Sequence, residues 1–211
     1  NFAQRTTLRL FADWQTQGRE NVPPQGPLIV VSNHISNLDP QLLASSIPRR
    51  LRFVAKRGLF KPVASFFFRA YGAYPMNRDG NDLAAALWLR KVLAGDGAVV
   101  LFPETTRSGS PGMRRGVPGV ALMALRTQAP ILPVGIVGSE CVGPPWQTLF
   151  PHGTIRVNIG QPFTLPAIEG KVGRPQLEAL TTMIMERVAA QLPEQYRGVY
   201  QIIPHKKVSI R

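Results

Sequence analysis

The sequence predicts an α/β fold, a single domain built on a mixed, largely parallel sheet flanked by helices. Short apolar, β-branched runs alternate with longer segments of helical periodicity through most of the chain. The 211 residues suit one domain of moderate size, and no internal repeat, low-complexity segment or long linker divides them. We therefore treat residues 1–211 as one domain with its own hydrophobic core.

The expected strands are short and mostly apolar. Pro133 lies inside one of these runs, so that strand is expected to be weakened or to lie at an edge of the sheet. The run at 154–160 alternates apolar and polar residues, which indicates a half-exposed strand. The full set of predicted strands covers residues 27–31, 51–55, 73–76, 98–102, 131–138 and 154–160.

Helices are expected before and between these strands. Residues 1–17 combine apolar and basic side chains and predict an amphipathic helix, within an N-terminal segment (1–20) that ends before NVPPQG. The last helix is expected over 175–192, where Pro193 ends an apolar stripe of helical period. The other predicted helices cover residues 40–46, 58–72 (a helix or a partly helical loop), 81–93 and 117–127.

The chain is strongly basic. Its 25 Lys and Arg residues face 12 Asp and Glu residues, which gives a formal net charge of +13. Such a surface attracts nucleic acid, anionic lipid headgroups or a phosphorylated substrate. A standard nucleic-acid-binding motif is missing, so no nucleic acid is expected as a partner. A basic nucleic-acid- or lipid-binding protein without catalysis stays open as the alternative of another class.

Cysteine content and hydropathy narrow the class further. Cys141 is the single cysteine of the chain, which excludes an internal disulfide. No apolar run approaches the ~20 residues of a transmembrane helix, and we expect no signal peptide. Because the sequence starts at Asn1, the possibility of an N-terminal anchor upstream of it stays open.

The stretch SNHISNLDP, residues 32–40, directly follows the first expected strand. On a straight helix, side chains five residues apart point about 140° away from each other, at about 3.6 residues per turn. Asn33, Asn37 and Pro40 favour a turn instead, which folds Asp39 back onto His34. A carboxylate that accepts a hydrogen bond from one ring nitrogen leaves the other as a proton acceptor, as general-base catalysis requires.

Simpler interpretations of these two residues also stay open. Asp39 is a suitable N-cap for the helix that begins near Pro40, and His34 is then a loop histidine bonded to backbone. In the catalytic interpretation, no Ser or Cys has the nucleophile-elbow pattern. The nucleophile is therefore expected to be a hydroxyl of the substrate.

A second polar stretch, FPETTRSGS at 102–110, follows another expected strand. Arg107 offers a planar guanidinium group suited to phosphate. Glu104 is expected either to accept a hydrogen bond from a substrate hydroxyl or to hold Arg107, and a solvated polar turn is the alternative. Because α/β folds bind ligands at the carboxyl ends of their strands, both stretches are candidate site segments.

Taken together, these stretches resemble the glycerolipid acyltransferase family, which includes the PlsC-type lysophosphatidic acid (1-acylglycerol-3-phosphate) acyltransferases. The family pattern is N-H-x4-D, then G-x5-R, then F-P-E-G-T-R-S, then an apolar strand with Pro. Residues 28–138 carry these blocks in order: Asn33, His34 and Asp39; Gly72 and Arg78; Phe102, Pro103, Glu104, Thr106, Arg107 and Ser108; and Pro133. The resemblance also covers Lys56 and implies a fold like that of glycerol-3-phosphate acyltransferase.

Two departures from the family pattern concern the acceptor. Thr105 stands where the family has Gly, and a β-branched residue avoids the positive φ that Gly permits. Either the backbone is ordinary at this position or the acceptor pocket is reshaped. The segment AYPMN before Arg78 is less aliphatic than in the family. Other acceptors therefore stay open: glycerol-3-phosphate, a lysophospholipid or a non-phosphorylated lipid alcohol.

The resemblance implies acyl transfer in phospholipid biosynthesis, from a thioester of coenzyme A or acyl carrier protein to a hydroxyl of lysophosphatidic acid or a related lipid. His34 would act as the general base and Asp39 would orient it. Arg78 and Arg107 would bind the acceptor phosphate, and Glu104 would bind a glycerol hydroxyl. Further substrate-binding residues implied by the resemblance are Lys56, Gly72, Thr106 and Ser108. Neither a metal nor a cofactor is expected, since the thioester is already activated.

The span from Pro40 to Arg78 contains no acidic residue and eight basic ones. Together with the lipid substrate, it predicts peripheral docking on an anionic membrane surface, at its cytoplasmic face, helped by residues 1–17. The predicted contacts are Phe60, Lys61, Phe66, Phe67, Phe68 and Arg69. The alternative is that the phenylalanines belong to the core and that the basic residues form a solvated face.

Overall fold

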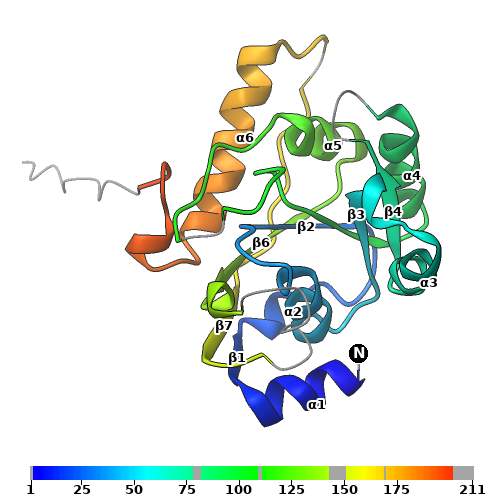
Figure 1. Cartoon of the computed structure of the whole chain (residues 1–211). Coiled ribbons are helices and arrows are strands. Elements are labelled where there is room, and N and C mark those ends of the chain that lie inside the picture. Colours follow the sequence, from blue (N-terminus) through cyan, green and yellow to red (C-terminus); the bar gives the residue numbers. More distant parts are fainter. Residues whose placement is uncertain (1, 78–81, 109–110, 143–150, 169, 202–211) are drawn as a thin grey trace, which may run out of the picture.

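The computed structural model describes residues 2–77, 82–108, 111–142, 151–168 and 170–201 (Figure 1). Its strands are β1 (Asp13–Gln17), β2 (Leu28–Ser32), β3 (Leu51–Lys56), β4 (Ala73–Met76), β5 (Ala98–Leu101), β6 (Ile131–Val137) and β7 (Thr154–Ile159). Its α-helices are α1 (Phe2–Phe11), α2 (Asp39–Ser46), α3 (Pro62–Ala70), α4 (Leu83–Ala94), α5 (Gly119–Thr127) and α6 (Arg174–Ala189). Short 3-10 turns include η2 (Arg57–Leu59), η3 (Ser139–Cys141) and η5 (Glu194–Tyr196).

These strands form one mixed sheet in the order β1-β7-β6-β2-β5-β3-β4. Strands β6, β2, β5, β3 and β4 run parallel to one another. Strand β7 pairs antiparallel with β6, and β1 pairs parallel with β7, so these two strands run the opposite way. The predicted single domain with a mixed, largely parallel sheet is confirmed.

Helices cover both faces of the sheet, and β2 shows why its sequence is continuously apolar. Leu28 and Val30 belong to the core on the side of α1 and α2, whereas Ile29 and Val31 belong to the core on the side of α4, α5 and α6. All four side chains are fully buried. A strand covered on both faces has no position for a polar side chain, so its period-two alternation disappears. Figure 1 shows α1 and α2 on one side of the sheet and α5 and α6 on the other.

The N-terminal segment corrects one prediction. The helix expected over 1–17 ends at Phe11, and the next residues form β1, whose backbone pairs with β7. Trp14 and Thr16 are half-buried while Asp13, Gln15 and Gln17 are exposed, which is the period of a strand. Pairing with a strand about 140 residues away therefore overrides the local helical pattern.

Pro133 corrects a second prediction, since β6 is an interior strand between β7 and β2. The Pro133 carbonyl accepts the Gly160 N–H at 2.9 Å, on the β7 side. The N–H and C=O groups of one strand residue point towards the same neighbouring strand. The position where Pro133 lacks an N–H therefore also faces β7. There the register shifts by one residue, from Val134 opposite Ile159 to Ile131 opposite Phe163. An interior proline is tolerated because it coincides with this irregularity.

The connections that follow β2 and β5 leave the sheet in opposite directions, and a ligand site can form between them. The chain leaves β2 through α2 towards β3 and leaves the adjacent β5 through α5 towards β6, on the opposite face and in the opposite direction. Ligand sites of open α/β sheets lie outside the carboxyl ends of the strands at such a switch point. The segments that follow β2 and β5 are the two polar stretches singled out in the sequence. Among the helices of the described residues, none combines the length and the apolarity needed to cross a bilayer.

Candidate active site

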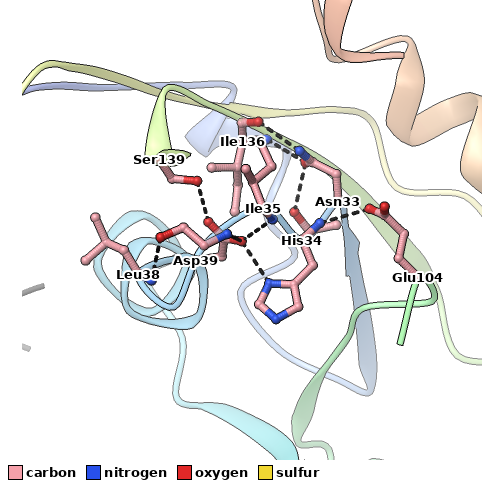
Figure 2. A network of polar contacts seen from close by, with 10 residues as sticks. Asn33, His34, Ile35, Leu38, Asp39, Glu104, Ile136 and Ser139 are labelled. Carbon is pink, nitrogen blue, oxygen red and sulfur yellow. Dashed lines mark hydrogen bonds and ion pairs between the residues drawn. The ribbon is translucent and has the colours of Figure 1, made fainter. Parts of the chain in front are cut away.

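The turn after β2 folds Asp39 back onto His34, as predicted. The distance from His34 Nδ1 to Asp39 Oδ2 is 2.8 Å (Figure 2). The same oxygen accepts the backbone N–H groups of Ile35 at 2.7 Å and Ser36 at 2.8 Å. Asp39 is fully buried as the first residue of α2, and a buried carboxylate is stable only with such donors.

The contacts of His34 determine which nitrogen can accept a proton. A carboxylate at Nδ1 places the imidazole proton there and leaves Nε2 as the acceptor. The ring stacks on Phe102, with the centroids 4.2 Å apart and an interplanar angle of 23°. Its side chain keeps 12% of its surface exposed. The imidazole is therefore fixed in orientation by two segments and remains accessible to a small group.

Glu104 connects the turn after β5 to the turn after β2. Its Oε1 accepts the backbone N–H of His34 at 2.9 Å, and its Oε2 accepts that of Arg114 at 2.8 Å. Only 5% of Glu104 is exposed, and this burial raises the pKa of its carboxyl although the two backbone bonds oppose the shift. Both carboxylate oxygens of Glu104 accept backbone N–H groups, and among the described residues no ion pair joins Glu104 to Arg107, so the structure gives Glu104 the role of holding two turns together.

Thr105 occupies a left-handed backbone conformation, with φ 60°. The turn is closed by hydrogen bonds from Thr105 N–H to Phe102 O at 3.1 Å and from Thr106 N–H to Glu104 O at 2.7 Å. The sequence left open whether the backbone at Thr105 has an ordinary conformation, and the positive φ excludes this. Threonine here holds the conformation that glycine adopts without steric cost.

The end of β6 supplies two further links that the sequence did not indicate. The side-chain amide of Asn33 donates to Ile136 O at 2.9 Å and accepts from Ile136 N–H at 2.8 Å. Ser139 Oγ donates to Asp39 Oδ1 at 2.6 Å. Ser139 follows β6 as His34 follows β2, so the rule that sites lie at the carboxyl ends of parallel strands is the signal that could have identified it.

A family model described as "Acyltransferase" matches residues 13–137, more than half of the chain. The chain belongs to this acyltransferase family. The match runs from β1 through β6 and includes the turns after β2 and β5; α1, the η3 turn with Ser139, β7 and α6 lie outside it.

Named relatives and a solved structure agree with the family. A chloroplastic 1-acyl-sn-glycerol-3-phosphate acyltransferase (BAT2) of Brassica napus is 32% identical over 158 residues, covering 72% of this chain and 46% of that protein. Human 1-acyl-sn-glycerol-3-phosphate acyltransferase alpha is 30% identical over 124 residues, covering 57% of this chain and 44% of that protein. The chain spans about half the length of the curated relatives it matches.

The crystal structure of the 1-acyl-sn-glycerophosphate (LPA) acyltransferase PlsC from Thermotoga maritima superposes with a TM-score of 0.68. It is 27% identical to this chain, and the alignment covers 87% of this chain and 73% of that one. The expected similarity of fold is therefore confirmed over most of this chain.

Two of the three cationic residues predicted to bind substrate lie at the same edge of the sheet as His34. Lys56 is the last residue of β3 and Arg107 follows β5, and both are exposed. Thr106 is also exposed, and its Oγ1 accepts from Arg114 Nη1 at 3.3 Å. Ser108 lies on the same segment, with its N–H donating to His34 O at 2.9 Å. Arg78 lies outside the described residues.

Gly72 does not join this group. It precedes β4 and therefore lies at the amino end of the parallel strands, at the opposite edge from His34. Its φ of 90° and its carbonyl, which accepts from Phe53 N–H at 3.1 Å, set the turn into β4. A Cβ atom here would lie 3.0 Å from Leu51 O, so the role the structure gives Gly72 is conformational rather than substrate-binding.

The residues predicted to contact a membrane separate into two groups. Phe60 and Phe68 are half-buried, pack against the core and lie 5.3 Å apart between ring centroids, so the alternative of core packing holds for them. Phe66 is 72% exposed on α3. Lys61 and Arg69 are exposed as well. Phe67 lies on α3, but its side chain is outside the described part of the structure.

Proposed function

We propose that this chain is an O-acyltransferase that moves a fatty acyl group from a thioester to the free hydroxyl of 1-acylglycerol-3-phosphate. The observation that carries the proposal is the His34–Asp39 pair, with Nδ1 held by a buried carboxylate and Nε2 left to accept a proton. The names of the relatives and the likeness to PlsC support the same reaction and acceptor.

The proposed reaction needs no acyl-enzyme. The acceptor hydroxyl gives its proton to His34 Nε2 while its oxygen attacks the thioester carbonyl, which forms the new C–O bond. The tetrahedral intermediate then collapses, the C–S bond breaks, and the departing sulfur takes the proton back from His34. Asp39 stabilises the imidazolium between these steps, because its carboxylate stays bonded to Nδ1 throughout.

We place the acceptor phosphate at the exposed cations of this edge, Lys56 and Arg107, with Arg78 as a third residue by sequence. A planar guanidinium binds two phosphate oxygens at once, which suits Arg107. Within the described ranges, no carboxylate pairs with either residue, so both charges are available. The acyl donor is a thioester of coenzyme A or of acyl carrier protein.

We further propose that the enzyme docks peripherally on the anionic, cytoplasmic surface of a membrane. Helices α1 and α3 lie on the same face of the sheet, since Leu8 and Phe68 pack into one core cluster. Both helices carry exposed apolar side chains: Leu10 at 70% and Phe11 at 48% from α1, and Phe66 at 72% from α3. Lys61 and Arg69 flank Phe66 and suit anionic headgroups.

A transfer assay tests the function. The purified chain is mixed with acyl-CoA, or acyl carrier protein thioester, and a panel of acceptors on anionic vesicles, with products identified by mass spectrometry. We expect 1-acylglycerol-3-phosphate to be converted to the diacyl product, and His34→Ala to abolish conversion. The matched control His152→Ala removes another histidine and should leave transfer intact. Preference for another acceptor would replace the acceptor assignment, and a wild-type chain without transfer would contradict the function.

A further inference from the structure

We infer that Ser139 is a positioning residue for acyl transfer, which holds the Asp39 carboxylate in the orientation that His34 requires. The inference rests on the proposed function. Ser139 Oγ donates to Asp39 Oδ1 at 2.6 Å, and both side chains are fully buried. Figure 2 shows the Ser139 hydroxyl directed at the carboxylate from the side away from the imidazole ring.

The hydrogen bonds to Asp39 are divided unequally between its two oxygens. Oδ2 meets three groups: the His34 ring and the backbone N–H groups of Ile35 and Ser36. All three belong to the turn that precedes α2. Oδ1 has a single donor among the described residues, and this is Ser139, which lies 100 residues further along the chain. The carboxylate is thus fixed at one end by its own turn and at the other by the segment after β6.

The backbone on both sides of Ser139 is held in place, which fixes the position of its hydroxyl. Gly138 has φ 83° between β6 and the η3 turn, and a Cβ there would collide with the Thr154 carbonyl oxygen. On the far side of Ser139, the Glu140 carboxylate accepts from the Tyr196 hydroxyl of η5. Burial and this hydrogen bond raise the pKa of Tyr196 to about 12, so the phenol remains a donor at neutral pH. The η3 turn is therefore anchored on both sides.

The chemical consequence concerns the geometry of the catalytic pair. A carboxylate held at one oxygen can rotate about its Cβ–Cγ bond, which moves the other oxygen away from Nδ1. Hydrogen bonds to the partner of a catalytic or ligating histidine fix its tautomer and ring orientation. Small errors in the position of a general base cost much of its effect. Ser139 is not a nucleophile, because it is fully buried and bonds to the carboxylate rather than to the imidazole.

The kinetic test is Ser139→Ala. Loss of a hydrogen bond to a charged group predicts a fall in kcat of about 10- to 100-fold. KM for both substrates should stay unchanged, because Ser139 does not reach the substrates. Ser45→Ala is the matched control: Ser45 is also fully buried on α2, but its hydroxyl has no hydrogen-bond partner among the described residues. That control should keep wild-type kcat.

A pair of isosteric variants and a double-mutant cycle separate positioning from packing. Ser139→Thr keeps a hydroxyl and should retain more kcat than Ser139→Val, which has the same shape without a donor. In the Asp39→Ala background, Ser139→Ala should cause no further loss, because its only target has gone. A loss that adds in full to that of Asp39→Ala, or a change confined to KM, would overturn the inference.

Nitrogen NMR of the imidazole gives a readout that does not depend on activity. The chain has three histidines, so His152→Gln with His205→Gln leaves the His34 signals alone. With Ser139 present, the spectrum should show one tautomer with the proton on Nδ1, and Ser139→Ala should give a mixture. A single unchanged tautomer together with wild-type kcat would exclude the positioning role. If the wild-type chain proved inactive, the proposed function would fail while this spectrum still decided the role of Ser139.

Discussion

The carboxylate of Glu104 accepts the backbone N–H of His34 at 2.9 Å, so the loop after β5 holds the main chain of the turn after β2. Its second oxygen accepts the Arg114 N–H, which brings a third point of the chain to the same buried group. The residue thus joins three backbone segments without reaching the surface. Its effects should appear in stability as well as in rate.

Glu104→Gln keeps the size of the side chain but places an NH2 group against one of the two backbone N–H groups. We expect the free energy of unfolding to fall by about 1–3 kcal/mol, because one buried donor loses its acceptor. Activity should fall as well, since the His34 backbone loosens. Chemical denaturation and the transfer assay measure the two effects. Glu178→Gln, on an exposed residue of α6, is the control and should change neither.

The raised pKa of Glu104 also predicts a pH dependence of stability. Because the folded-state pKa lies above the unfolded value, the contribution is complete below the unfolded pKa and is lost as pH rises through the folded one. The stability of the wild type relative to Glu104→Gln should therefore decline as the pH rises above the ordinary glutamate pKa of about 4. A difference that grows as the pH rises would show that the hydrogen bonds, rather than burial, dominate the pKa.

Thr105→Gly should stabilise the protein. Threonine at φ 60° is strained, and glycine relieves a left-handed penalty of about 1–2 kcal/mol while it loses part of that gain to the entropy of the unfolded chain. The expected net gain in unfolding free energy is about 1 kcal/mol. Thr106→Gly, at the next residue without a positive φ, should instead destabilise. An equal loss of unfolding free energy in the two variants would contradict backbone strain at Thr105.

Arg107→Ala should raise KM for a phosphorylated acceptor and leave KM for the acyl thioester unchanged. Arg107→Lys should restore only part of the affinity, since a point charge lacks the bidentate fork. The control is Arg126→Ala, on an exposed arginine in the last turn of α5, which should change neither KM. Steady-state kinetics with each substrate varied in turn gives the result. Unchanged acceptor KM in Arg107→Ala would place the phosphate elsewhere.

Phe66→Ser should weaken the salt-resistant part of binding to anionic vesicles without unfolding the protein, because this side chain is 72% exposed. The electrostatic part should fall as salt shortens the screening length from ~10 Å at 0.1 M to ~3 Å at 1 M. Leu87→Ser, an exposed apolar residue of α4 on the other face of the sheet, is the matched control. Cosedimentation measures both variants. Equal vesicle binding by the wild type and Phe66→Ser would contradict membrane contact by Phe66, and α1 would be the next helix to test.

Local patterns in the sequence predicted the contact between His34 and Asp39, whereas the residues that support this pair depend on distant contacts. His34 and Asp39 lie within one turn, and the turn-forming residues between them favour the observed geometry. The bonds from Glu104 to the backbone of His34 and Arg114 were not predicted, because a carboxylate after a strand has the same sequence signature whether it faces solvent or is buried against backbone. Ser139 was missed for a related reason, since its partner is 100 residues away.

The fold shows the same division between local and distant information. The buried strand β2 was predicted almost to the residue because its apolar run is continuous. Strand β1 was predicted as helix, since its partner β7 is remote in sequence. Pro133 suggested an edge because sequence alone does not show that a register change absorbs the missing donor.

The pairing of β1 with β7, from Asp13 opposite Thr154 to Gln17 opposite Asn158, has a consequence for synthesis of the chain. Strand β1 leaves the ribosome about 140 residues before β7, its neighbour in the sheet among the described strands. Until β7 emerges, β1 presents unpaired backbone groups and the apolar side of Trp14 to its surroundings. This edge of the sheet therefore closes late in folding, and until it closes the unpaired strand can pair wrongly with other chains.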